Sequence, residues 1–325
     1  MVFKLDRTQL TQNNRTILGD WVEKDLSQLE SALQQLSQDI PETKIVQHGR
    51  VLALRSTDTN RLYSAFKAAL YLGKYGDMDN TERFLTKMVK SHHSYEPIRG
   101  ENVLFLYIGV GKPVYDHMIT YTVGRPTRIA GGQRANLPWG IEIPMEMKDR
   151  EGYIERNMKR VQDVINLTGK GEEKPQQREQ LQAARSELPV GYIMPPFLLE
   201  FSEESLIKSV LRQRLWEQGA QGATVDVVND MWQCLLQIDK EKWEFLEGYH
   251  GQDTIKWEKA MRTLREKDYT LTDFIDLCIE AGHIPPIDLD TEENGKAYDL
   301  ENVKLYDLIM ATAGKLPATM WDKIK

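Results

Sequence analysis

Val103-Leu104-Phe105-Leu106-Tyr107-Ile108-Gly109-Val110 is a continuous run of aliphatic and aromatic residues, which is typical of a buried strand. Lys112-Pro113 ends this run, and residues 114–123 are predicted to form a helix. The helix leads into Gly124-Arg125-Pro126-Thr127-Arg128-Ile129-Ala130-Gly131-Gly132-Gln133-Arg134-Ala135-Asn136, which combines three arginines with adjacent glycines. We interpret this segment as a turn that follows a strand and a helix.

Two interpretations of this turn remain open. Glycines allow the backbone N–H groups to approach an anion, and the arginine guanidinium offers paired donors that match phosphate or carboxylate oxygens. The turn is therefore either an anion-binding pocket or a solvated, glycine-rich surface loop. It does not contain a strict phosphate-loop pattern.

Composition limits the classes of protein to which the chain can belong. Its 325 residues are 41% hydrophobic and 28% charged, as in a soluble globular protein. The net charge of −7 makes nucleic acid an unlikely partner, because binders of nucleic acid gain affinity by neutralising phosphates. Two cysteines form neither a disulfide framework nor a cysteine-based zinc motif, and no run is long enough to span a membrane. We expect a cytoplasmic protein without a metal site.

Periodicity and turn signals predict a mixed chain of helices and short strands. His48-Gly49 separates two β-type runs, residues 44–47 and 50–54, and is interpreted as the turn of a hairpin. Residues 139–143 are expected to be extended, and residues 168–178 to be a flexible loop or a capped helix start. Apolar spacing predicts helices over residues 21–37, 60–72, 80–91, 151–167 and 205–216, and another through residues 228–235.

Two further segments contain residues that binding sites often use. His92 and Ser94 follow the predicted helix 80–91, where a loop can present them to a site; the alternative interpretation is that they are surface polar residues. Asp288, Asp290 and Glu292 lie in an acidic segment whose glycine, Gly295, comes too late for a calcium-binding EF-hand. We interpret the acidic segment as a solvated loop.

The order and spacing of these elements resemble the flavin-dependent thymidylate synthase family over residues 60–240. His92-His93-Ser94 is similar to the family's His-x-Ser/Thr element. A register without gaps from Pro113 places Thr127 on the first serine of Arg-His-Arg-x-x-Ser-x-Asn-Glu-x-Ser-x-Arg-Tyr, and Arg134 on its last arginine. The later elements Ala-Arg-x-x-Leu-Pro, Ser-Leu, arginine and Ala-Gln are similar to Ala184-Arg185 with Leu188-Pro189, Ser205-Leu206, Arg214 or Arg212, and Ala220-Gln221.

The chain also departs from this pattern. In the same register, Thr122-Val123-Gly124 stands in place of Arg-His-Arg, and Ile129-Ala130 in place of Asn-Glu. Gly132, Ala135 and Ala223 replace the second serine, the tyrosine and the glutamate that follows Ala-Gln. In the family, Arg-His-Arg and its neighbours hold the flavin. Arg125 and Arg128 are additional charges in this turn, and they either replace those contacts or bind a different anion.

The resemblance implies an α/β (α+β) fold in which a curved sheet is flanked by helices, and a cytoplasmic homotetramer. It implies residues 56–240 as the core, with residues 1–55 as an N-terminal helical extension with the start of the hairpin, and residues 241–325 as a C-terminal helical extension. The implied reaction is reductive methylation of a pyrimidine nucleotide at C5, with FAD as the cofactor and methylenetetrahydrofolate and NADPH as cosubstrates. The implied site residues are Arg214 for catalysis; Arg134, Arg185, Gln133 and Thr127 for the nucleotide monophosphate; and His92, Ser94, Arg125 and Arg128 for the cofactor.

The sequence leaves two functions open. The first is an enzyme that transfers a one-carbon unit to C5 of dUMP or a related nucleotide. The second is a non-catalytic nucleotide-binding or assembly protein that has kept the fold and lost the flavin site.

Overall fold

The protein was analysed as a computed structural model that describes residues 3–40, 44–73, 76, 96–119, 126, 128–131, 138–167, 175–217, 222–252 and 255. The chain divides into two compact units. One unit comprises Met1–Thr59 and Arg99–Lys240, and the other comprises Asn60–Ile98 and Glu241–Lys325. All the described strands belong to the first unit.

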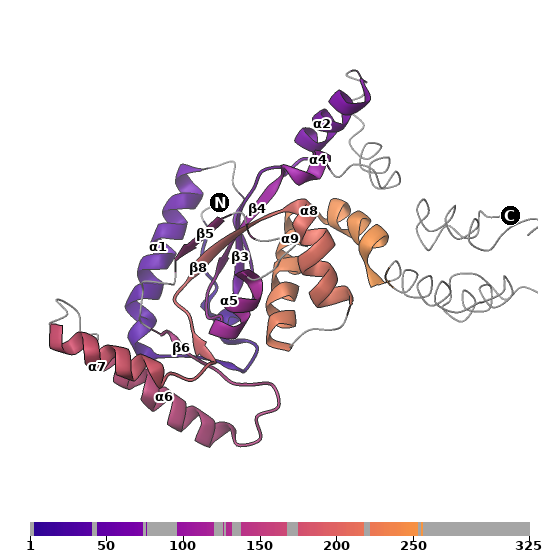
Figure 1. Ribbon diagram of the computed structural model, residues 1–325. Coiled ribbons are helices and arrows are strands. Elements are labelled where there is room, and N and C mark those ends of the chain that lie inside the picture. The colour runs from indigo at the N-terminus through magenta and orange to yellow at the C-terminus, as the bar shows by residue number, and fades with distance from the viewer. Residues whose placement is uncertain are drawn as a thin grey trace, which may run out of the picture. The chain divides into compact units, whose positions relative to one another are not determined.

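A five-stranded antiparallel sheet forms the centre of the first unit. Its strands lie in the order β2-β3-β4-β8-β5. Figure 1 shows this sheet between helices, which confirms the expected mixed α/β class. The strands are β2 (Val46–His48), β3 (Val51–Ser56), β4 (Asn102–Tyr107), β5 (Arg128–Gly131) and β8 (Phe197–Ser202).

Strands β2 and β3 form the predicted hairpin. His48 pairs with Val51, so Gly49 and Arg50 make up a two-residue turn. Gly49 has φ +53°, a backbone conformation that glycine adopts without steric cost.

Alternate residues of the sheet face different helices. Leu52 and Leu106 pack in one hydrophobic cluster with Leu26 and Leu33 of α1 (Glu23–Asp39). On the other face, Tyr107 stacks on Phe197, and Phe197 forms a T-shaped contact with Tyr115 in α5 (Lys112–Ile119). The Tyr107 hydroxyl also donates to Sδ of Met231 in α9 (Gly222–His250), so the central strands are covered on both sides.

A smaller sheet carries the segment that leads to the candidate site. It contains β1 (Thr16–Leu18), β6 (Gly140–Glu142) and β7 (Tyr192–Ile193), all antiparallel. The helices α6 (Arg150–Leu167) and α7 (Pro175–Ser186) pack against one another between β6 and β7 in the chain.

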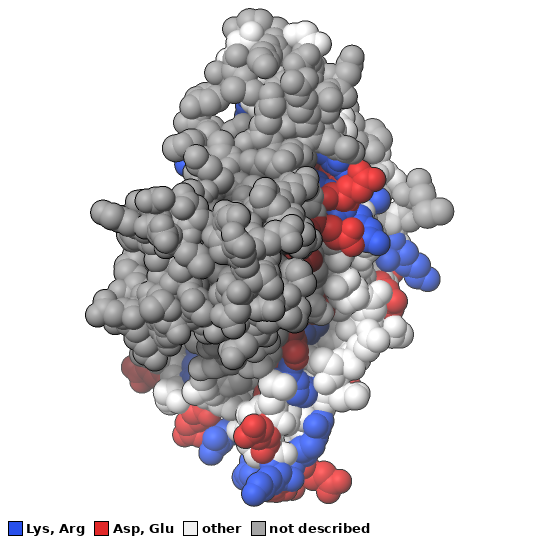
Figure 2. Space-filling view, turned by 90° about the vertical axis from the view of Figure 1, so that its right-hand side faces the viewer, with Lys and Arg blue, Asp and Glu red and all other residues white. Residues whose placement is uncertain are grey.

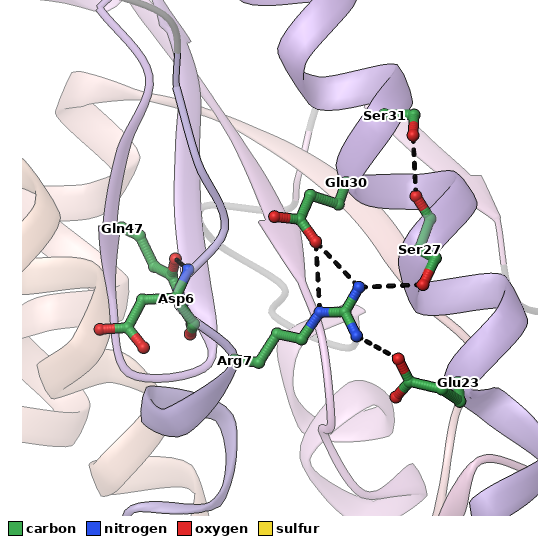
Figure 3. A network of polar contacts seen from close by, with 7 residues as sticks. All are labelled: Asp6, Arg7, Glu23, Ser27, Glu30, Ser31 and Gln47. Carbon is green, nitrogen blue, oxygen red and sulfur yellow. Dashed lines mark hydrogen bonds and ion pairs between the residues drawn. The ribbon is translucent and has the colours of Figure 1, made fainter.

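The N-terminal residues are tied to α1 and to β2 by polar contacts (Figure 3). In η1 (Arg7–Thr11), the Arg7 guanidinium donates to Glu30 and Ser27 of α1 and forms an ion pair with Glu23. The backbone of Asp6 exchanges two hydrogen bonds of 2.9 Å with the Gln47 amide. These contacts fix the start of the chain against the first unit.

The described part of the second unit is helical. It contains α2 (Leu62–Leu72), whose Ala65, Ala68 and Ala69 are buried together, and the last residues of α9 beyond a kink at Asp239. Arg61, which precedes α2, forms a 2.8 Å ion pair with Glu241. The short helix α4 (Glu96–Arg99) crosses the boundary between the units in the chain.

Most of the expected helices are present. The predictions for residues 21–37, 60–72 and 151–167 are confirmed by α1, α2 and α6, and the helix through residues 228–235 is confirmed by α9. Of the two interpretations of residues 168–178, a helix start is correct from Pro175 onward. The predicted helix 80–91 and the acidic segment 287–295 lie outside the described residues.

One prediction needs correction, one strand was not predicted, and one predicted helix has π-helical geometry. Residues Arg128–Gly131 form strand β5, so the arginine-rich segment is not a turn throughout. Strand β8 was not predicted, although it pairs with both β4 and β5. The helix predicted for residues 205–216 is confirmed; it consists of a single turn, α8 (Glu203–Ser205), followed by a π-helix, η4 (Leu206–Trp216).

Candidate functional site

The structure describes only part of the predicted site. His92, Ser94, Arg125, Thr127, Gln133 and Arg134 lie outside the described residues. Arg128 is described by its backbone, which pairs with Glu200 across β5 and β8. Of the predicted site residues, only Arg185 and Arg214 have described side chains.

Arg185 lies in the last turn of α7, where its backbone carbonyl accepts a hydrogen bond from the Leu188 amide at 3.2 Å. Its side chain is half-buried. The Nε and Nη2 atoms are buried and have no hydrogen-bond partner among the described residues. An unsatisfied buried donor is costly, and more so when it is charged, because the group has lost water without gaining another partner. Arg185 therefore has free donors that an anionic ligand could satisfy.

A tight return of the chain after α7 brings Tyr192 within electrostatic range of Arg185. After α7 ends at Ser186, the Tyr192 amide donates to the Pro189 carbonyl at 2.9 Å, and the chain enters β7. Burial raises the pKa of the Tyr192 hydroxyl, Lys112 and Arg185 lower it, and Asp116 raises it. Tyr192 is therefore within electrostatic range of two cations and one carboxylate.

Lys112 is placed beside Tyr192 by backbone pairing. Gly111 and Ile193 form an antiparallel bridge, and the Met194 amide donates to the Val110 carbonyl at 2.9 Å. Lys112 begins α5, forms an ion pair with Asp116 one turn later, and has its ammonium group 5.7 Å from the centre of the Tyr115 ring. The charges of Lys112 and Arg185 thus both act on the phenol of Tyr192, the first residue of β7.

A buried ion pair that no sequence pattern predicts adjoins this segment. Arg50 Nη1 donates to Glu142 Oε1 at 2.7 Å and is 3.5 Å from the Thr16 hydroxyl. A Cβ added to Gly111 would lie 2.5 Å from Glu142 Oε2, so the carboxylate occupies the space beside this glycine. Arg50 Nη2 has no partner among the described residues. Arg50 follows a turn glycine between two apolar runs, and that pattern does not predict a buried ion pair.

Two carboxylates of α9 contact Arg50 and Arg15, close to this ion pair. Asp230 accepts a hydrogen bond from the Arg50 backbone amide at 3.1 Å, and Asp226 forms an ion pair with Arg15. Burial raises the pKa of Asp230, whereas the hydrogen bond from the Arg50 amide and the charges of Arg50 and His48 lower it, and Asp226 raises it. Asp230 therefore links α9 to the β2–β3 turn, and Asp226 links α9 to Arg15, the residue before β1.

The π-helix η4 contains two of the candidate arginines, Arg212 and Arg214. A π-helix closes hydrogen bonds between residues five apart. Accordingly, the Glu217 amide donates to the Arg212 carbonyl at 2.9 Å, and the Arg212 side chain donates to Glu217 at the same distance. Arg214 is half-buried in the last turn of the helix. The choice of Arg214 as the catalytic arginine stays a prediction.

Charge elsewhere on the described surface is mixed. On the face in Figure 2, the lysines and arginines of the described residues are interspersed with aspartates and glutamates. Within the described ranges, no group of three or more His, Cys, Asp or Glu side chains is arranged to hold a metal ion. The described helices also include none that is both long and apolar enough to cross a bilayer.

Comparison with known proteins gives a structural similarity only. The sequence matches no protein-family profile and no curated protein. Among solved structures, the chain is similar to the UMP/dUMP methylase PolB from Streptomyces cacaoi, crystallised with 5-Br dUMP. The two have 13% sequence identity and a TM-score of 0.43, over 65% of this chain and 97% of that chain.

Proposed function

We propose that the protein binds a nucleotide monophosphate through Arg185 and transfers a one-carbon unit to C5 of its pyrimidine ring, with dUMP or a related nucleotide as the substrate. The observation that carries this proposal is the pair of buried Arg185 donors without a partner among the described residues. Arg185 is also the arginine that the Ala-Arg-x-x-Leu-Pro element assigns to the nucleotide.

A planar guanidinium suits this role for a physical reason. It presents parallel N–H donors that match two oxygens of a phosphate or the edge of a pyrimidine, and such charge-assisted bonds are stronger than neutral ones. The ion pair of Arg50 and Glu142 lies beside this segment, because the Glu142 carboxylate is next to Gly111, the residue that precedes helix α5 and its first residue Lys112. The backbone that carries Lys112 is therefore packed against a buried ion pair.

In the proposed reaction, methylenetetrahydrofolate supplies the carbon, and flavin supplies a hydride that NADPH replenishes. Arg214 is proposed to polarise the pyrimidine so that C5 becomes nucleophilic, and Arg134, Gln133 and Thr127 to contact the nucleotide. His92, Ser94, Arg125 and Arg128 are proposed for the flavin. None of these four side chains belongs to the described part, so the flavin site is inferred from the sequence resemblance alone.

One observation favours a second function. Thr122-Val123-Gly124 stands where the resembling family has Arg-His-Arg, and these residues lack the charge that holds a flavin. The alternative is a nucleotide-binding or assembly protein, a homo-oligomer such as a tetramer, that retains the Arg185 site without catalysis.

Two measurements separate these functions. The purified protein is mixed with FAD, passed through gel filtration and examined for visible absorption. It is then incubated with [5-³H]dUMP, methylenetetrahydrofolate and NADPH, and the release of tritium to water is measured. Retained flavin together with tritium release supports the enzyme. Binding of dUMP with neither flavin nor tritium release supports the alternative, and absence of dUMP binding rejects both.

A further inference from the structure

Lys112 and Tyr192 each adjoin a residue of an isolated antiparallel bridge, the one between Gly111 and Ile193. The bridge between Gly111 and Ile193 and the hydrogen bond from the Met194 amide to the Val110 carbonyl hold the two chain segments together, so the neighbouring residues Lys112 and Tyr192 are brought close to one another. The position of Lys112 is thus fixed by the backbone rather than by a flexible loop. Ile193 also pairs with Gly140 of β6, so β7 lies between β6 and the Gly111–Lys112 segment.

Arg185 is brought close to Tyr192 by the short connection between α7 and β7. The hydrogen bonds from Leu188 to Arg185 and from Tyr192 to Pro189 bring the end of α7 back to β7 within seven residues. The charges of both Lys112 and Arg185 act on the Tyr192 hydroxyl. The three groups supply donors of a kind that binds phosphate oxygens, namely a guanidinium, an ammonium and a phenol.

Asp116 is the acidic member of this cluster. Its carboxylate forms an ion pair with Lys112 four residues earlier in α5, and the two side chains are 46% and 32% exposed. A partly exposed pair of this kind contributes little to stability and is easily exchanged for another partner. A ligand phosphate and Asp116 would therefore compete for the same ammonium group.

We propose that Lys112 and Tyr192 join Arg185 in one site for a phosphate monoester, and that Asp116 holds Lys112 in the free protein and competes with the ligand for it. This inference rests on the proposed function, since it names two further residues of the Arg185 site and the part of the nucleotide that they bind. It makes the affinity dependent on the 5′-phosphate rather than on the base.

The test is calorimetric titration of the full-length protein with dUMP, deoxyuridine and inorganic phosphate. We expect Lys112→Ala to weaken dUMP binding about three- to tenfold and Tyr192→Phe about two- to fivefold, since one partly exposed contact is lost in each. Asp116→Asn is expected to tighten dUMP binding about two- to fivefold, because Lys112 is released. If the ion pair of Lys112 and Asp116 had only a structural role, Asp116→Asn would weaken dUMP binding instead. Binding of deoxyuridine is expected to be unchanged in all three variants.

Arg156→Ala and Asp149→Asn are the matched controls. Arg156 and Asp149 form an exposed ion pair at α6, so these variants change the net charge by the same amounts away from the proposed site. Dichroism spectra of every variant check that the fold is retained.

The outcomes separate this inference from the proposed function. If Arg185→Ala weakens dUMP binding while Lys112→Ala and Asp116→Asn match the controls, the inference is wrong and the proposed function stands. If wild-type protein binds inorganic phosphate but not dUMP, and Asp116→Asn tightens that binding, the inference stands and the proposed function is wrong. Weaker or unchanged binding of both probes by Asp116→Asn overturns the inference.

Discussion

Glu142 accepts a 2.7 Å hydrogen bond from Arg50 in a setting where the two side chains are only 6% and 2% exposed. Removing one partner of such a pair leaves the other charge buried and uncompensated. We expect Glu142→Gln to lower the free energy of unfolding by about 3–5 kcal/mol. Urea denaturation followed by far-ultraviolet dichroism measures the change.

A double variant separates the charge from its surroundings. Arg50→Met combined with Glu142→Leu removes both charges, so its destabilisation is expected to be smaller than the sum of the single effects. A Glu142→Gln protein within about 1 kcal/mol of the wild type would show that the pair is not buried as described.

Gly49→Ala tests the approach of α9 to the β2–β3 turn. Gly49 has φ +53°, and a Cβ at this position would lie 2.4 Å from the Asp230 carboxylate. We expect it to destabilise the protein by more than the roughly 1–2 kcal/mol of the backbone conformation alone. Gly109→Ala is the control, because Gly109 also has a positive φ, of +73°, but its nearest contact is a Thr16 methyl group at 3.2 Å. Equal losses in the two variants, measured by urea denaturation, would place Asp230 away from the turn.

Asp230 predicts a dependence of stability on pH. Burial raises the pKa of Asp230 above the ordinary value of 3.8, and the charge of Asp226 raises it further. The hydrogen bond from the Arg50 amide and the charges of Arg50 and His48 lower this pKa, but they do not outweigh burial. The folded protein therefore retains this proton more readily than the unfolded chain, and the stabilisation from the proton is lost as the pH rises through the folded-state pKa. Relative to the wild type, Asp230→Asn should gain stability from a pH near 3.8 upward.

The measurement is the free energy of unfolding of the wild type and of Asp230→Asn at a series of pH values from acid to neutral. Asp163→Asn serves as the control, since Asp163 is exposed on α6. A difference between wild type and Asp230→Asn that stays constant with pH would contradict a raised pKa.

The sequence predicts those elements whose pattern is local, and it does not predict those defined by pairing between distant residues. Periodic apolar spacing identified α1, α6 and α9, and the turn glycine Gly49 identified the hairpin, because both signals are local. Strand β8 escaped prediction because it follows two prolines and is defined by pairing with β4 and β5, which lie far from it in the sequence. Strand β5 lies within a glycine- and arginine-rich segment whose composition indicates a turn.

The candidate site shows the same limit. Arg185 was found because it lies in a recognisable Ala-Arg-x-x-Leu-Pro element just before a helix end. Lys112 and Tyr192 were missed because they are 80 positions apart and meet only through the bridge of Gly111 with Ile193. Glu142 was missed because a single acidic residue in an extended run gives no sign of its buried partner Arg50.

Titration of Arg185→Ala with dUMP tests the central claim most directly. The change removes a charged donor group whose Nε and Nη2 atoms have no protein partner among the described residues, so the fold should persist and the ligand contact should be lost. We expect affinity to fall about ten- to a hundredfold, equivalent to about 1.5–3 kcal/mol, with Arg156→Ala at the wild-type value. An Arg185→Ala protein that is folded and binds dUMP as tightly as the wild type would contradict the account.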